Sequence, residues 1–235
     1  GVEETRLTYT NPSGQPMALY FFTVDLNNPD VTLQVATPNN GTDMGAKQTV
    51  TSQISYKNTA NPTLEVIGAV NGDYWRTNTT EVDPTPLGHP YGLVHKNSVQ
   101  IKPITKNGSY FYFSIQQDLN AFFGTKGDAL IATIKEGLGG RYSLLQNGVE
   151  MPGTLGYNTN VEPRTAVGMI NSKKVVFLVV DGRDAAWSQG YTMHNLAKIF
   201  KAIGCTYAVN MDGGGSSTFV ANSGTLSAPT YTIKN

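Results

Sequence analysis

Apolar runs along this chain predict more strands than helices. In Val31–Ala36 apolar and polar residues alternate, which is typical of a half-buried strand, and Leu19–Leu26 is a neighbouring β-rich run. Val175–Val180 contains no polar residue, so we expect a central strand buried on both faces. Shorter strands are expected at Leu64–Val70, Tyr91–Val94, Ser98–Ile101, Ser109–Ile115, Tyr142–Gln146 and Thr165–Ile170.

One stretch, at about residues 190–203, has a strong helical period. Its apolar stripe consists of Leu196, Ile199, Phe200 and Ile203. Ser188 or Thr192 can cap the start of this helix, and Gly204 can end it. A short helix is also expected at Val50–Tyr56, and helical turns at Leu119–Phe123 and Ala129–Glu136.

The segment from Val175 to Val209 therefore reads strand, loop, helix, strand. A right-handed crossover would place both strands in one sheet and bring Asp181 beside Asp212 at one edge. Ligands of open sheets bind at such an edge. We expect an α+β fold forming a single domain over residues 1–235, with a large mixed, strongly twisted sheet. Within it, residues 1–60 would be an N-terminal β-rich portion and residues 64–221 a core that carries the motifs.

Composition narrows the function classes. Lys plus Arg and Asp plus Glu both number 17, so the zero net charge gives no sign of nucleic-acid binding. The surface is expected to be rich in Asn, Thr and Tyr, as in extracellular proteins that handle sugars, so we expect an exported protein whose signal segment has been removed. No apolar segment reaches 18 residues, and the single Cys205 excludes an intrachain disulfide. No protein partner is indicated.

The most unusual stretch follows the strand that ends near Val209. Asn210 and Asp212 precede three consecutive glycines, Gly213–Gly215, and then Ser216 and Ser217. Three residues without Cβ allow a ligand to approach the backbone, at an entropic cost that a simple turn does not require. This loop is therefore expected to belong to a binding or catalytic site.

Small and polar residues stand at the ends of four strands. They form the groups Asn71-Gly72-Asp73, Pro163-Arg164-Thr165, Asp181-Gly182-Arg183 and Asn210-Met211-Asp212. If these groups converge, three carboxylates meet two guanidiniums, which bind phosphate through paired hydrogen bonds. Taken alone, Asn71 and Asp181 are equally typical of ordinary turns, and Arg183 is typical of a solvent-exposed loop.

Several other kinds of site do not fit. No Gly-Lys-Ser/Thr follows the glycines as a P-loop requires, and Ser216 lacks the frame of a serine-hydrolase elbow. The three histidines lack zinc-ligand spacing. We expect no required cofactor, although clustered Asp and Asn oxygens could hold Ca²⁺.

Together these groups resemble the motifs of the phosphodiester glycosidase family. The resemblance extends over about residues 64–220. It also includes Ser188-x-Gly190-x-Thr192 before Leu196-Ala197, and the glycine-rich segment Gly137–Gly148. In the helix motif, Asn195 stands where the family usually has glutamate.

The resemblance implies hydrolysis of a sugar-1-phosphodiester, of the N-acetylglucosamine type, at the anomeric carbon. Asp212, Asp181 or Asp73 would then act as base, nucleophile or stabiliser of the oxocarbenium ion. The substrate-binding residues expected on this basis are Asn71, Arg164, Arg183, Thr192, Asn210, Gly213, Gly214, Gly215, Ser216 and Ser217. Two alternatives stay open, a non-catalytic phosphosugar-binding protein and an ordinary glycoside hydrolase.

Overall fold

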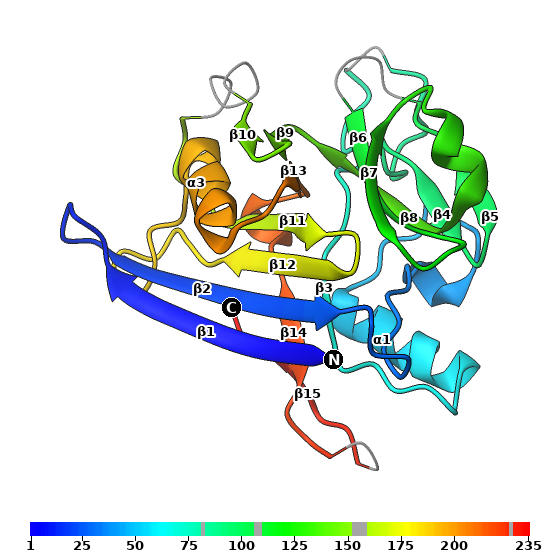
Figure 1. The fold of residues 1–235 in the computed structure, drawn as a ribbon, viewed down its shortest axis with the longest axis horizontal. Coiled ribbons are helices and arrows are strands. Elements are labelled where there is room, and N and C mark those ends of the chain that lie inside the picture. The colour runs from blue at the N-terminus through cyan, green and yellow to red at the C-terminus, as the bar shows by residue number, and fades with distance from the viewer. Residues whose placement is uncertain (81–82, 106–109, 152–158, 226–227) are drawn as a thin grey trace.

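The computed structural model describes residues 1–80, 83–105, 110–151, 159–225 and 228–235. Its strands form three sheets (Figure 1), of which the largest has the order β1-β2-β12-β11-β13-β9-β10. In that order, the strands are Val2–Thr10, Pro16–Asp25, Lys174–Val180, Arg164–Asn171, Tyr207–Asn210, Ser143–Gln146 and Val149–Glu150.

Two smaller sheets and two α-helices complete the described part of the chain. The three-stranded sheet consists of β15 (Tyr231–Ile233), β14 (Phe219–Asn222) and β3 (Gly68–Val70). The five-stranded sheet consists of β5 (Val99–Lys102), β4 (Val94–Lys96), β8 (Ile134–Arg141), β6 (Tyr110–Gln116) and β7 (Ala121–Thr125). The helices are α1 (Val50–Ala60) and α3 (Met193–Ile203), with short 3₁₀ turns η1 (Pro38–Asn40), η2 (Ala129–Thr133) and η3 (Gly214–Ser216).

The α+β class is confirmed in outline, but the expectation of one mixed sheet is wrong. Each pair of neighbouring strands in the described sheets is antiparallel. The crossover through α3 does connect two parallel strands, β12 and β13. They are not neighbours, because β11 lies between them and pairs antiparallel with both.

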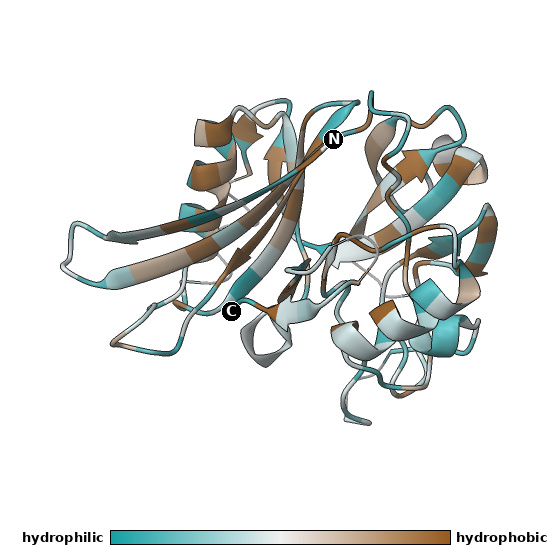
Figure 2. Cartoon of the chain, turned by 90° about the horizontal axis from the view of Figure 1, so that it is seen from below, coloured by the Kyte–Doolittle hydropathy of each residue, from teal (hydrophilic) through white to brown (hydrophobic). Residues whose placement is uncertain are grey.

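Strand β12 is the buried central strand that its composition predicts. Its side chains alternate between two hydrophobic clusters, with Leu178 in the cluster that includes α3 and Val179 in the cluster on the opposite face. Phe200 of α3 covers the first face, and Phe219 of β14 covers the second. In Figure 1, α3 accordingly lies on one side of the large sheet and β14 on the other. In Figure 2, hydrophobic colour concentrates along the strands.

Helix α3 is capped as the sequence predicts, whereas α1 continues to Ala60, beyond its predicted end at Tyr56. The Thr192 side chain accepts a hydrogen bond from the Asn195 backbone N–H, and Gly204 ends α3 in the left-handed conformation at φ 91°. Thr49 caps α1 in the same way by accepting from Ser52 N–H. No helix in the described ranges has the length and apolar character needed to cross a membrane.

Several predicted elements are wrong or incomplete. The predicted strands Leu64–Val70 and Tyr91–Val94 are extended only from Gly68 (β3) and from Val94 (β4) onward. Val31–Ala36 is not a strand, because the Val35 N–H donates to the Glu136 carboxylate at 2.8 Å instead of to a neighbouring strand. Leu119–Phe123 is not helical, because Ala121–Thr125 pairs with β6 as β7. Ala129–Glu136 contains one 3₁₀ turn and then enters β8.

Candidate active site

The predicted groups meet at one edge of the large sheet. Arg164 begins β11 opposite Val180 at the end of β12, and Ala166 lies opposite Asn210 at the end of β13. The residues that follow β12 and β13 therefore flank the start of β11. The expectation that both strands deliver their polar ends to the same edge is confirmed.

Asn71 joins three segments at this edge. Its side-chain Nδ2 donates to the Asp212 backbone oxygen at 2.8 Å, while Oδ1 accepts from the Thr165 hydroxyl and from Thr218 N–H. These bonds fix β3, β11 and the loop after β13 relative to one another. The predicted substrate-binding residue Asn71 is thus engaged in positioning Asp212.

Asp73 lies in a cradle of glycine backbone. Its Oδ2 accepts from Gly92 N–H at 2.5 Å, and a Cβ at Gly92 or Gly139 would approach Oδ2 to 2.5 or 2.7 Å. This close approach explains why glycines occupy both positions. Within the described structure, Oδ1 is buried without a hydrogen-bond partner. Burial raises the pKa of Asp73 to about 7, and the nearby Asp212 carboxylate contributes to the increase.

Asp212 is more accessible than Asp73. Its Oδ1 accepts from Gly213 N–H at 2.9 Å, and a hydrogen bond with the Ser216 side chain lowers its pKa. Burial is the larger effect, so the pKa of Asp212 is raised above its ordinary value. Asp73 and Asp212 therefore form an interacting pair of carboxyls with raised pKa values, a combination frequent at functional sites.

The two predicted guanidiniums have different environments. Arg164 is buried, and its Nε and Nη2 donate to the backbone oxygens of Tyr191 and Asn160. Arg183 is 58% exposed, forms an ion pair with Glu162 at 2.6 Å, and lies over Gly214, where a Cβ would come within 3.0 Å of its Nη2. Burial lowers the pKa of Arg164, with Arg183 among the nearby charges. Both cations thus lie beside the glycine loop, Arg164 near Gly213 and Arg183 near Gly214.

Asp181 reaches the same edge but contacts a different cluster. Its Oδ2 accepts from the Trp187 indole N–H at 3.0 Å, and its charge acts on Tyr20. Arg6 lies over the Trp187 ring at 4.8 Å from its centroid. The structure therefore brings Asp73 and Asp212 together, whereas Asp181 contacts β2 and the loop before α3.

The glycine loop uses most of its own N–H groups. Gly213 donates to Asp212, Gly214 to the Pro163 oxygen, and Ser216 and Ser217 to oxygens within the loop. The loop is thus a tight wall that carries Asp212. These bonds count against the idea that its consecutive amides form an anion nest.

Tyr74 is a site residue that the sequence analysis did not single out. Asn210 Nδ2 donates to the Tyr74 hydroxyl at 2.6 Å. Burial raises the pKa of Tyr74, the Asp212 charge adds to this, and Arg164 opposes it. The hydroxyl consequently stays protonated and can donate a hydrogen bond at the site. Its position directly after the Asn71-Gly72-Asp73 group was the available signal.

Three buried polar atoms at this edge have no partner among the described residues, namely Asp73 Oδ1, Asn210 Oδ1 and Ser217 Oγ. Such atoms are rare in folded proteins and often mark functional sites. The described residues contain no group of three or more His, Cys, Asp or Glu side chains suited to hold a metal.

Thr192 and Asn195 belong to the helix cap, outside the carboxylate pair. The Thr192 side chain is occupied by the Asn195 N–H, and Asn195 is exposed. Asn195 is the third residue of α3, where glutamate would complete a capping box with Thr192. The absence of glutamate at this position thus affects the cap, while Asp73 and Asp212 keep their contacts.

We expect Asn195→Glu to stabilise the protein by about 0.5 kcal/mol and leave turnover unchanged, because it adds a capping carboxylate near the positive end of a helix. Chemical denaturation and a steady-state assay measure the two quantities. Asn195→Ala, which places no carboxylate at this exposed position, is the matched control. A change in turnover for Asn195→Glu but not for the control would contradict the structural assignment.

Comparisons with known proteins agree with this architecture. The catalytic domain of zebrafish N-acetylglucosamine-1-phosphodiester alpha-N-acetylglucosaminidase, auto-inhibited by its pro-peptide, is similar with a TM-score of 0.66 at 18% identity, over 99% of this chain and 81% of that one. A hypothetical protein from Synechocystis has a TM-score of 0.64 at 11% identity, and the match covers 93% of this chain and 57% of that one. A putative exported protein from Burkholderia pseudomallei K96243 has a TM-score of 0.60 at 14% identity, and the match covers 90% of this chain and 70% of that one. At these identities the likeness shows a shared fold.

Among curated protein sequences, none matches the chain significantly. The sequence model of the phosphodiester glycosidase family matches residues 64–234, which includes the whole carboxylate and arginine edge described above. The chain therefore belongs to the phosphodiester glycosidase family.

Proposed function

We propose that the protein hydrolyses a sugar-1-phosphodiester of the N-acetylglucosamine type at the anomeric carbon, on extracellular or cell-envelope glycans. The observation that carries this proposal is the interacting pair Asp73 and Asp212 beside the cations Arg164 and Arg183. A carboxyl group can act as base, nucleophile or stabiliser of positive charge at the anomeric carbon, and guanidinium groups can bind the phosphate. Family membership and the enzyme named for the zebrafish relative support the same reaction.

In the proposed reaction, the bond between the anomeric carbon and the phosphate oxygen breaks, and its electron pair leaves with the phosphate. The oxygen of water ends on the carbon. Asp212 either takes the proton of that water or first bonds to the carbon itself. A phosphate monoester is a stable anion, so protonation of the leaving group matters less than in ordinary glycosides. Asp73, with a pKa of about 7, can retain a proton near neutral pH and limit repulsion within the pair.

Arg183 and Arg164 have separate roles in this proposal. Arg183 is exposed, so a phosphate can replace Glu162 as its partner. Arg164 is buried and donates to two backbone oxygens, so it supplies a fixed positive charge beside the glycine loop.

The test is a substrate panel at fixed enzyme concentration. UDP-N-acetylglucosamine and a simple N-acetylglucosamine-1-phosphodiester should release free N-acetylglucosamine, whereas N-acetylglucosaminides of the same sugar that lack phosphate should not. Release is measured by a reducing-sugar assay. Equal turnover of substrates with and without the phosphate would indicate an ordinary glycoside hydrolase and overturn the proposal, as would binding of the phosphodiesters without turnover.

Within this panel, Arg183→Gln should lower kcat/KM for the phosphodiester by about 10- to 100-fold, because it removes charge-assisted hydrogen bonds to the phosphate. Glu162→Gln is the matched control, since it breaks the same ion pair but keeps the guanidinium. It should retain most of the activity. An equal loss in both variants would assign the ion pair a structural role only.

A further inference from the structure

A cavity of about 1090 Å³ adjoins the candidate active site. Asp73, Asp212 and Ser216 line it at the sheet edge, and Lys57 and Glu136 line another part of it beside α1. The walls between them are largely apolar, including Leu33, Val35, Ile54, Val70, Leu138 and Met211. The volume slightly exceeds the range of about 300–1000 Å³ that is typical of pockets for small-molecule ligands.

Three charged side chains are buried beside this cavity. Lys57 is 8% exposed, Lys96 7% and Glu136 4%. Their mutual electrostatic influence shows that they form one cluster, since Glu136 acts on both lysines and Lys57 acts on Lys96. Two cations and one anion leave this cluster with an excess positive charge.

Two members of the cluster have partners. The Glu136 oxygens accept from Val35 N–H at 2.8 Å and Asn97 N–H at 3.0 Å. The Lys96 ammonium donates to Thr37 Oγ1 and to both oxygens of Asn40, at 2.6–2.9 Å. The cluster is therefore held in place by the protein itself.

Lys57 is the exception. Within the part of the chain that the structure describes, its ammonium makes no hydrogen bond or ion pair, although the residue lines the cavity and Glu136 is near enough to act on it. Burial lowers the pKa of Lys57, which reflects the cost of an unpaired charge at this position. An anion placed in the cavity would remove that cost.

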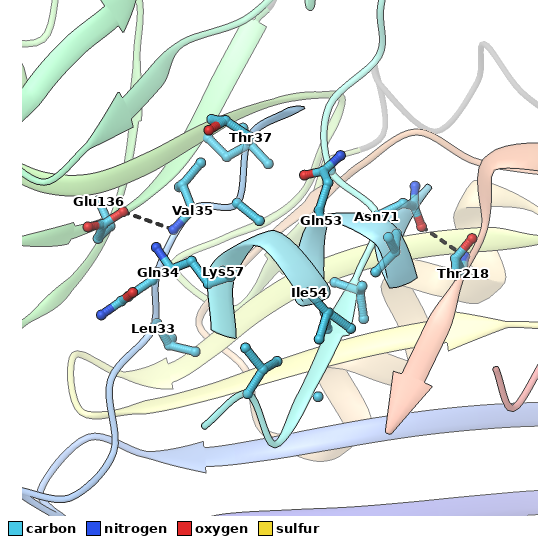
Figure 3. Close-up of a pocket in the computed structure, with 18 of the residues that line it drawn as sticks. Leu33, Gln34, Val35, Thr37, Gln53, Ile54, Lys57, Asn71, Glu136 and Thr218 are labelled. Carbon is cyan, nitrogen blue, oxygen red and sulfur yellow. Dashed lines mark hydrogen bonds between the residues drawn. The ribbon is translucent and has the colours of Figure 1, made fainter. Parts of the chain in front are cut away.

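Figure 3 shows how the ends of the cavity are arranged. Lys57 and Glu136 lie on one side of Ile54, and Asn71 and Thr218 lie on the other. Asn71 positions Asp212 by its bond to the backbone. A ligand that reaches from the carboxylate edge to Lys57 must therefore pass along the apolar walls beside α1.

We propose that this cavity holds the aglycone of the substrate, and that this aglycone is not a polar glycan but has an extended apolar body with an anionic group that pairs with Lys57. That the ligand is the aglycone of a substrate rests on the proposed function, whereas the binding of an apolar anion in this cavity does not. The apolar walls favour the body of such a ligand, and the excess positive charge favours its acidic group. Continuity with Asp212 places its sugar phosphate at the carboxylate edge.

The test uses laurate, which has an apolar chain and one carboxylate, and dodecanol, which has the same chain without charge. Isothermal titration calorimetry on the full chain should show one laurate bound, and Lys57→Gln should weaken it by at least about 10-fold. Dodecanol should bind both proteins equally. Lys198→Gln, an exposed lysine on the other helix, is the matched control and should bind laurate as the unchanged protein does.

Laurate should also inhibit phosphodiester hydrolysis competitively. Absence of laurate binding, equal binding by Lys57→Gln, or binding without inhibition of an active enzyme would each overturn the aglycone site. Because laurate binding needs no turnover, its result is independent of the proposed function. If the protein binds laurate through Lys57 but cleaves no phosphodiester, the proposed hydrolysis is wrong, whereas the binding site for an amphipathic anion is retained.

Discussion

Replacing Asp212 with Asn will lower turnover of a sugar-1-phosphodiester by about 10³-fold or more, while the thermal midpoint stays within a few degrees of the unchanged protein. The amide cannot take a proton from water or bond to the anomeric carbon. Its oxygen can still accept the hydrogen bond from Gly213 N–H that holds the side chain in place. Turnover is measured by sugar release and the midpoint by thermal unfolding.

The geometry explains why the effect should be confined to chemistry. Asp212 is fixed mainly through its backbone, which donates to the Gly72 oxygen and accepts from Asn71 Nδ2. Neither bond depends on the carboxylate. Moreover, removal of one of two interacting carboxyls relieves repulsion on Asp73, so the fold has no reason to weaken.

Asp184→Asn is the matched control for this experiment. Asp184 is an exposed carboxylate in the loop after β12, and its Oδ1 accepts from Ala186 N–H much as Asp212 accepts from Gly213 N–H. It should leave turnover unchanged. Wild-type activity in Asp212→Asn would remove Asp212 from the mechanism, and a matching loss in Asp184→Asn would point to a general electrostatic effect.

The sequence predicted those parts of the fold that depend on local pattern. The uninterrupted apolar run Val175–Val180 can only be accommodated between two covered faces, and the cap residues Thr192 and Gly204 act through their own helix. Val31–Ala36 shows the limit of such reasoning. Alternating apolar residues indicate that one side of a segment packs on apolar neighbours. A strand also needs backbone hydrogen bonds to a neighbouring strand, but here the Val35 N–H donates to the Glu136 carboxylate.

The candidate site was partly predictable for the same reason. The edge that collects Asp73, Arg164 and Asp212 follows from strand ends, which are visible in the sequence. The direction of each side chain does not, so Asp181 was grouped with Asp212 although it contacts Trp187. The cluster around Lys57 joins α1, β4 and β8. These segments are far apart in the sequence, so no local pattern predicts their contact.

The second large effect concerns the pH dependence of stability. Because the folded protein raises the pKa of Asp73 from 3.8 to about 7, it binds this proton more tightly than the unfolded chain does. The stabilisation is complete below about pH 4 and is lost as pH rises to about 7. The difference corresponds to up to about 4 kcal/mol in the free energy of unfolding.

Asp73→Asn removes that titration, so the stability of the variant relative to the unchanged protein should rise by about 3 kcal/mol between pH 4.5 and pH 8. Any cost of fitting the amide into the buried position is the same at each pH, because the amide does not titrate. Only the slope is therefore diagnostic. Urea denaturation of both proteins at several pH values measures it.

Asp118→Asn provides the contrast. Asp118 is exposed, and the Asn120 backbone N–H holds the pKa of its carboxyl below the ordinary value, so this group remains ionised throughout the same pH range. Its substitution should produce a constant difference in stability. If Asp73→Asn also gives a flat difference, the Asp73 carboxyl is not destabilised by burial, and it cannot be the member of the pair that retains a proton near neutral pH. Asp212 would then face a fully charged neighbour, and the repulsion would have to be offset by Lys102, whose charge acts on Asp73 while its ammonium donates to the backbone oxygens of Tyr91 and Gly92.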